Sequence, residues 1–223
     1  MIPSSRLQIH GVPNENGDVV VYWMTAARRA QWNHALEHAI GLADEHNLPL
    51  VVIECLALQH RWANDRISTF VLQGMVDNRS AFSGTNVTYI PYVETKRKEA
   101  SGLLKGWLEH ARLCVIDDYP TYYPKHVLDT ALSVIPCEIH VVDSNGFMAM
   151  RAQGRDFSTA YSLRRHLHKT IREHMHEFPK QRPLDDAQDL PQMDPAVVKA
   201  IFAQTNTPMT PYEFLWRVSE GGD

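Results

Sequence analysis

Two pairs of residues have side chains that could perform chemistry: the histidines His34 and His38, and the carboxylates Asp117 and Asp118. Two histidines four residues apart on a helix can bind one metal ion, and Glu37 lies beside them. The sequence there is not HExxH, however, and neither histidine falls on the apolar stripe, which favours a solvated helix face. Adjacent residues at a strand end usually point in different directions, so we expect Asp117 and Asp118 to cap a turn and to line a cleft. We therefore predict neither a metal site nor a catalytic group.

The motifs that usually hold phosphate groups are absent. The sequence has neither GxGxxG after its first apolar run nor GxxxxGK[ST], which disfavours dinucleotide and nucleoside-triphosphate binding. It also lacks GxSxG, so nucleophilic catalysis has no support. A helix N-terminus can still bind an anion through its free amides, and residues 25–28 are a candidate anion site on that ground. The alternative is that Thr25 only caps the helix.

Strand-like and helix-like segments alternate along the chain and must position these residues. Apolar, β-branched runs predict strands, and apolar residues at helical spacing predict the helices between them. The predicted strands are residues 19–24, 50–53, 87–93, 113–116 and 137–142, and the predicted helices are residues 28–46, 67–84, 103–111, 125–133 and 162–176. Parallel strands need helical crossovers. The sequence therefore predicts an α/β fold with a Rossmann-like, doubly wound, five-stranded parallel sheet.

Ligands of open parallel sheets bind beyond the carboxyl ends of the strands, and this rule selects the candidate binding residues. The predicted ligand contacts are Trp23, Met24, Thr25 and Arg28 after the first strand, Glu54 after the second, Asp117 and Asp118 after the fourth, and Asn145 after the fifth. We expect Trp23, Met24 and Arg28 to matter most for any ligand.

The composition narrows the class of partner and the compartment. The formal charge is −4 and the pI is near 6.3, so the whole chain has no basic field that would attract nucleic acid. One basic helix carries Arg164, Arg165, Lys169 and Arg172; it is either a solvated face or a contact for phosphate or an acidic partner. Three cysteines without CxxC spacing, no signal peptide and no apolar run of membrane-spanning length lead us to expect a soluble, cytoplasmic protein without a membrane partner.

The composition changes after residue 178, where prolines become frequent. We therefore predict one domain over residues 1–178 and a proline-rich linker or docking tail over residues 179–223. Two amphipathic fragments of this tail, residues 197–202 and 212–218, could pack on a partner through Ile201, Phe202, Phe214, Leu215 and Trp216. The alternative is that they pack back on the parent domain.

Several motifs, in the same order, resemble those of the photolyase/cryptochrome family, and of its class II cyclobutane pyrimidine dimer photolyases most closely. The specific part is the first block, which runs from Val20-Val21-Tyr22-Trp23-Met24 through Asn33-His34-Ala35-Leu36 to Leu48-Pro49-Leu50. Further similar segments are Phe70 to Met75, Val141 to Asn145 and Tyr161 to Arg165, so that the resemblance covers about residues 18–172. The turn after Asp143 and the segment from Asp117 to Tyr122 depart from the family pattern.

The resemblance implies an N-terminal α/β domain that holds a light-harvesting chromophore, a deazaflavin or, in relatives, a folate. In that family a larger C-terminal helical domain holds FAD and binds damaged DNA. We therefore expect no FAD within this chain, no photolyase (lyase) activity by the chain alone, and only indirect contact with DNA. The first hypothesis is that it binds an antenna chromophore or a nucleotide-like ligand and docks through residues 179–223 on a separate flavin domain, in DNA repair by light or in light sensing. The alternatives are a ligand-free regulatory or interaction module and a small nucleotide-acting enzyme, for which fold alone gives no licence.

Overall fold

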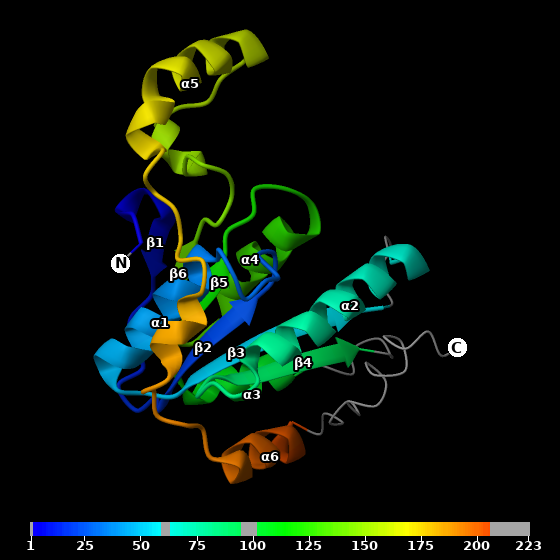
Figure 1. The fold of residues 1–223 in the computed structure, drawn as a ribbon. Coiled ribbons are helices and arrows are strands. Elements are labelled where there is room, and N and C mark those ends of the chain that lie inside the picture. Colours follow the sequence, from blue (N-terminus) through cyan, green and yellow to red (C-terminus); the bar gives the residue numbers. More distant parts are fainter. Residues whose placement is uncertain (1, 59–62, 95–101, 206–223) are drawn as a thin grey trace.

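The computed structural model describes residues 2–58, 63–94 and 102–205, and its centre is a six-stranded sheet (Figure 1). The strands are β1 (Leu7–His10), β2 (Val19–Met24), β3 (Leu50–Ala57), β4 (Thr88–Glu94), β5 (Ala111–Asp117) and β6 (Glu138–Val142). Their order across the sheet is β1-β6-β5-β2-β3-β4. The neighbouring strands from β2 to β6 pair in parallel, as predicted, whereas β1 pairs antiparallel with β6.

The sixth strand corrects the expectation of a five-stranded sheet. Strand β1 has only four residues, and its side chains are half-buried or exposed. A short edge strand of this kind carries no apolar run, so the pattern that revealed the five buried strands was missing here. The α/β class and the mostly parallel sheet are confirmed.

In the described parts of the chain, six α-helices and three short 3-10 segments connect and cover the strands. The α-helices are α1 (His34–His46), α2 (Asp65–Phe82), α3 (Leu103–His110), α4 (Tyr122–Val134), α5 (Ala160–His174) and α6 (Pro195–Gln204), and the 3-10 segments are η1 (Ser4–Arg6), η2 (Met150–Gln153) and η3 (Pro183–Ala187). Helices α1 and α2 cover one face of the sheet, and α3 and α4 cover the other, because alternate residues of the strands join different clusters.

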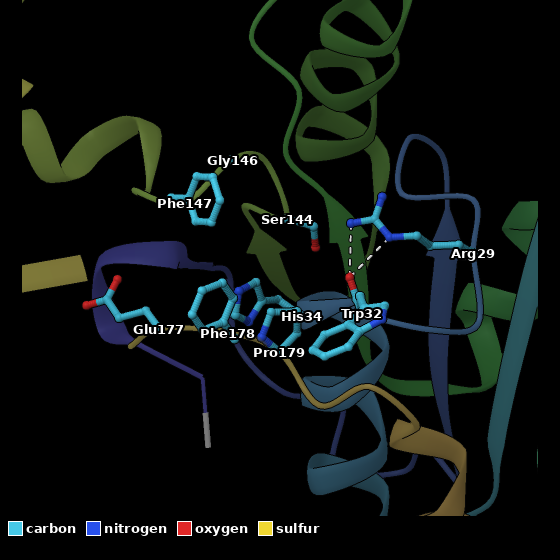
Figure 2. Close-up of a pocket in the computed structure, with 9 residues that line it drawn as sticks. All are labelled: Arg29, Trp32, His34, Ser144, Gly146, Phe147, Glu177, Phe178 and Pro179. Carbon is cyan, nitrogen blue, oxygen red and sulfur yellow. Dashed lines mark hydrogen bonds between the residues drawn. The ribbon is translucent and has the colours of Figure 1, made fainter. Parts of the chain in front are cut away.

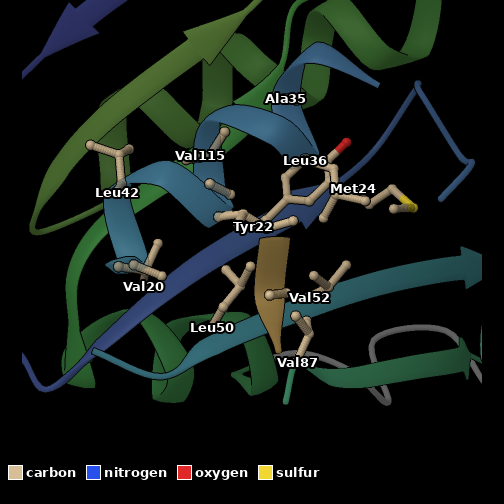
Figure 3. Close-up of a cluster of buried hydrophobic side chains, with 14 of the residues drawn as sticks. Val20, Tyr22, Met24, Ala35, Leu36, Leu42, Leu50, Val52, Val87 and Val115 are labelled. Atoms are coloured by element: carbon tan, nitrogen blue, oxygen red, sulfur yellow. The ribbon is translucent and has the colours of Figure 1, made fainter. Parts of the chain in front are cut away.

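The core is continuous across the central strands, which explains their apolar sequences. Val20, Tyr22 and Met24 of β2 face α1, where they meet residues such as Leu36 (Figure 3). Val19 and Val21 face the opposite way, into the cluster around Trp107 of α3. A parallel strand buried on both faces needs apolar residues at every position, not at every second one.

Helix α1 begins at His34, six residues later than the predicted start at residue 28. Asn33 caps it: the Asn33 side chain accepts a hydrogen bond from the Leu36 amide at 3.0 Å and donates to the carbonyls of Ala27 and Arg29. The residues between β2 and α1 therefore form a loop folded onto the helix cap. Thr25, the cap considered in the sequence, does not cap this helix.

Residues 183–204, in the described part of the predicted tail, pack on the domain instead of leaving it. Leu184, Ala187 and Leu190 join the cluster beneath α1, and Met193, Ile201 and Phe202 join the cluster beneath α3. Asn86 holds the crossing between the two faces, since its side-chain amide donates to the carbonyls of Gln188 and Leu190. The fragment at residues 197–202 thus packs on its own domain, and the fragment at residues 212–218, with Phe214, Leu215 and Trp216, lies outside the described residues.

Helix α5 stands away from the sheet, at the top of Figure 1. None of its residues is buried, and Arg164, Arg165, Lys169 and Arg172 are exposed along it. Among the described residues, no helix is long and apolar enough to cross a membrane.

Candidate functional site

A cavity of about 500 Å³ opens at the carboxyl ends of β2, β3 and β4. Four of the eight predicted contacts line it together: Trp23, Met24, Thr25 and Arg28. The remaining walls come from the ends of β3 and β4 and from α2, α3 and α4, and consist of Cys55, Leu56, Ala57, Ile67, Val71, Tyr92, Glu94, Leu103, Leu104, Pro124 and Val127. The cavity is therefore mainly apolar and aromatic, with one cation and one carboxylate at its edge.

The guanidinium of Arg28 is fixed over the ends of β2 and β3. Its Nη2 donates a short hydrogen bond to the Cys55 carbonyl, and its Nη1 lies 3.4 Å from Oε1 of Glu54. The Glu54 side chain is 1% exposed and accepts two further hydrogen bonds, from Asn78 at 2.9 Å and from Tyr89 at 2.5 Å. Glu54, a predicted ligand contact, thus holds the Arg28 guanidinium in place and does not itself line the cavity.

Replacing Arg28 with alanine should lower the free energy of unfolding by about 2–3 kcal/mol, because the buried Glu54 carboxylate would lose its cation. The half-buried position of Arg28 keeps the expected loss below that of a fully buried pair. Urea unfolding followed by circular dichroism measures it. Arg29→Ala is the matched control, since Arg29 is exposed and contacts the Trp32 carbonyl; equal stability of the two variants would contradict the anchoring role of Glu54.

Cys55 lines the cavity, but its thiol is not a nucleophile. Burial raises the pKa of its thiol to about 12, although the nearby Arg28 charge opposes that shift. A thiol with such a pKa is protonated at neutral pH, and the thiolate is the reactive form. The arrangement in this cavity therefore suits binding better than covalent chemistry.

Asp117 occupies the place where an external anion was expected. Its Oδ2 accepts hydrogen bonds from the amides of Thr25, Ala26 and Ala27 at 2.7–3.0 Å, and its Oδ1 accepts one from the Tyr22 hydroxyl at 2.8 Å. Burial raises the pKa of this carboxyl, and the four donors oppose the shift. The amides at residues 25–27 are taken by the chain itself, so the predicted anion site at residues 25–28 is wrong.

Asp118 and Asn145 hold together the ends of β5 and β6, away from the cavity. The Asp118 carboxylate pairs with Arg151, and the Asn145 side chain donates to the Asp118 carbonyl at 2.9 Å and to Asp143 at 3.0 Å. The buried Arg6 guanidinium donates to four carbonyls of the same turn, those of Asp143, Asn145, Gly146 and Phe147. The carboxylates of Asp117 and Asp118 therefore have separate partners, the amides of residues 25–27 and the guanidinium of Arg151.

Sequence reasoning missed the contribution of β4 and of α4. Tyr92 and Glu94 lie at the carboxyl end of β4 and line the cavity, as do Pro124 and Val127 of α4. The strand-end rule applied to the third predicted strand would have found Tyr92 and Glu94. No local pattern marks Pro124 and Val127, because only the packing of α4 brings them there.

His34 and His38 are not on a solvated face, which corrects the sequence interpretation. His34 is 3% exposed, and His38 stacks on His140 with ring centroids 5.0 Å apart and nitrogens 2.7 Å apart. Burial lowers the pKa of each of these two side chains to about 4; the nearby Arg6 charge adds to the shift at His34, and His140 adds to it at His38. Within the described residues no group of three or more histidine, cysteine or acidic side chains could hold a metal ion.

Comparison with known proteins gives photolyases by sequence, while no family model matches the chain. The chain is 31% identical over 133 residues to the deoxyribodipyrimidine photo-lyase of Methanothermobacter thermautotrophicus, a stretch that is 60% of this chain and 29% of that protein. It is 28% identical over 169 residues to the deoxyribodipyrimidine photo-lyase of Arabidopsis thaliana, which is 74% of this chain and 33% of the relative. The chain therefore spans about a third of the length of these relatives, and the expected resemblance to photolyases is confirmed.

Solved structures give a weaker likeness. Universal stress protein UspA from Lactobacillus plantarum has a TM-score of 0.39 at 14% identity over 56% of this chain and 98% of its own. A universal stress protein family member from Burkholderia pseudomallei has a TM-score of 0.37 at 16% identity over 58% of this chain and 98% of its own. Scores this low carry no argument about fold or function.

Proposed function

Because the chain contains a photolyase-related domain, we propose that it binds an antenna chromophore, a deazaflavin or a folate, in the cavity at the carboxyl ends of β2, β3 and β4. When bound, such a chromophore would absorb light and pass the excitation energy to a flavin held by a separate domain, in DNA repair by light or in light sensing. The Val20 to Met24 segment favours a position near the class II enzymes within the family.

The observation that carries this proposal is the lining of the cavity. A volume of about 500 Å³ lies within the roughly 300–1,000 Å³ usual for small-molecule sites. Trp23 and Tyr92 offer aromatic surfaces to a flat ring system, and aliphatic side chains from α2, α3 and α4 surround them. Arg28 lies at the edge of the cavity, and its Nη2, which already donates to the Cys55 carbonyl, has a second proton for a carbonyl oxygen of a deazaflavin or a pterin ring.

A ligand-free interaction module is the second candidate, and one observation favours it. The amide cluster at residues 25–27, the natural anion-binding element of this loop, is filled by Asp117. The cavity would then be left from an ancestor that bound a ligand. Docking on a separate partner, a flavin domain under the first candidate, would not use those side chains of the predicted tail that are buried, such as Leu184, Ile201 and Phe202.

A bulky residue placed in the cavity should abolish chromophore binding. Val127 is half-buried on α4 and lines the cavity, so Val127→Trp would fill part of it, and affinity should fall at least about tenfold, or about 1.4 kcal/mol. Val134→Trp is the matched control, because Val134 is on the same helix and 67% exposed. The probe is deazariboflavin or methenyltetrahydrofolate, titrated by absorbance and by quenching of tryptophan fluorescence.

The protein purified from its native source supplies the complementary measurement. A near-ultraviolet or blue absorption band, with a deazaflavin or folate mass released on denaturation, is the expected result. A colourless protein that also fails to bind either probe would overturn the proposal and favour the interaction module.

A further inference from the structure

A second cavity, of about 430 Å³, lies at the N-terminal end of α1 (Figure 2). Three large aromatic side chains at its walls are exposed: Trp32 by 44%, Phe147 by 60% and Phe178 by 56%. The rings of Phe147 and Phe178 meet edge to face, with centroids 5.8 Å apart. Exposed aromatic side chains gathered around a hollow are typical of a binding surface.

The polar groups of this cavity gather at one end. Figure 2 shows the Ser144 hydroxyl beside the guanidinium of Arg29, across the cavity from Phe147. Two nitrogens of Arg29, Nε and Nη2, donate to the Trp32 carbonyl at 3.1 and 3.0 Å, and its Nη1 makes no hydrogen bond within the described residues. The Ser144 oxygen accepts from the Ala35 amide at 3.3 Å, so its own proton is available to another acceptor.

The surroundings of this polar end favour an anion. Helix α1 has thirteen residues, and its positive end lies at Asn33 and His34, next to Ser144. Glu177 is the one carboxylate that lines the cavity; it pairs with His174 at 3.0 Å, and Figure 2 shows it pointing away from Arg29. The polar end of the cavity therefore has two free hydrogen-bond donors, Nη1 of the positively charged Arg29 and the hydroxyl of Ser144. No carboxylate among the lining residues lies beside them.

A buried histidine forms part of the floor of the cavity. His34 lines the cavity, is 3% exposed, and its Nδ1 makes no hydrogen bond within the described residues. Trp32 is also held at φ +50°, a conformation that side chains rarely adopt and that the two hydrogen bonds from Arg29 fix.

We propose that this cavity binds a flat aromatic molecule with one anionic group, of the nucleoside monophosphate type. The ring lies between Trp32 and the Phe147–Phe178 pair, and the anion lies at Arg29 and Ser144. This ligand is distinct from the chromophore of the first cavity, and the tryptophan that lines each cavity differs: Trp23 in the first and Trp32 in the second.

The test uses the full chain with AMP as the probe. Calorimetry and tryptophan fluorescence measure the affinity for AMP. AMP should bind at least about tenfold more tightly than adenosine, which lacks the anion, and than ribose 5-phosphate, which lacks the ring. Arg29→Gln and Phe178→Ala should each weaken AMP binding about tenfold. Arg155→Gln is the matched control, because Arg155 also lies against an aromatic ring, that of Phe157, 4.7 Å from its centroid, outside this cavity.

Three results would overturn the proposal. The first is equal affinity for AMP, adenosine and ribose 5-phosphate. The second is unchanged AMP affinity in Arg29→Gln and Phe178→Ala proteins whose thermal melting shows them to be folded. The third is loss of AMP binding in the Val127→Trp variant, which would place the ligand in the cavity of the proposed chromophore.

Discussion

Asp117→Ala should lower the free energy of unfolding by about 3–5 kcal/mol. The variant would leave the amides of Thr25, Ala26 and Ala27 and the hydroxyl of Tyr22 without their acceptor in a buried place. The β2–α1 loop should loosen as a result, and the wall that Thr25 contributes to the first cavity with it. Urea unfolding monitored by circular dichroism measures the loss.

Two further variants separate this effect from a change of charge. Asp117→Asn keeps an acceptor for the three amides and should cost about 1–2 kcal/mol, chiefly at Tyr22. Asp129→Ala removes an exposed carboxylate paired with Lys125 and should cost less than about 1 kcal/mol. An Asp117→Ala protein as stable as the Asp129→Ala protein would show that the loop amides do not depend on Asp117.

Acid should unfold the protein through His34 and His38. The folded state lowers the pKa of each of these side chains from 6.5 to about 4, so the unfolded chain binds protons first as the pH falls. Stability is therefore full above about pH 6.5 and decreases as the pH falls from 6.5 to 4. A shift of this size is worth about 3 kcal/mol for each histidine, because one pKa unit corresponds to about 1.4 kcal/mol.

The measurement is the free energy of unfolding from urea titrations at several pH values between 4 and 8. His38→Gln should remove about half of the decrease, since a glutamine amide can still donate to Nδ1 of His140 without taking up a proton. His168→Gln, at an exposed position of α5, should leave the decrease unchanged. A pH dependence that is the same in the His38→Gln protein would show that the pair of His38 and His140 does not carry it.

The parts of the fold that could be predicted are those with a local signal. Strands β2 and β3 are buried on both faces, so their apolar runs are continuous and easily recognised. The predicted start of α1 is too early, because Trp32 continues the apolar spacing of Ala35 and Leu36 although the chain has not yet entered the helix. The Asn33 cap decides the true start, and its other partners are loop carbonyls that no helical pattern includes.

The residues of the candidate site could be predicted where a general rule of sheet topology applied. They could not be predicted where a contact with a residue far away in the sequence determines the position of the side chain. The strand-end rule selected Trp23 and Arg28, and both line the cavity. It failed for Asp117, which lies at a strand end but turns towards amides 90 to 92 positions away in the sequence. The burial of His38 depends in the same way on His140, 102 positions later.

The crossing of residues 183–204 from one face of the sheet to the other bears on how the protein is made. This segment supplies Leu184 and Leu190 to one apolar layer, and Ile201 and Phe202 to the other. Both layers therefore stay incomplete on the ribosome until the chain has been synthesised to about Phe202. A nascent chain stopped earlier would expose apolar surface on both faces, where it is open to chaperones and to self-association. Completion of this domain should follow synthesis of its last described helix and not proceed strand by strand.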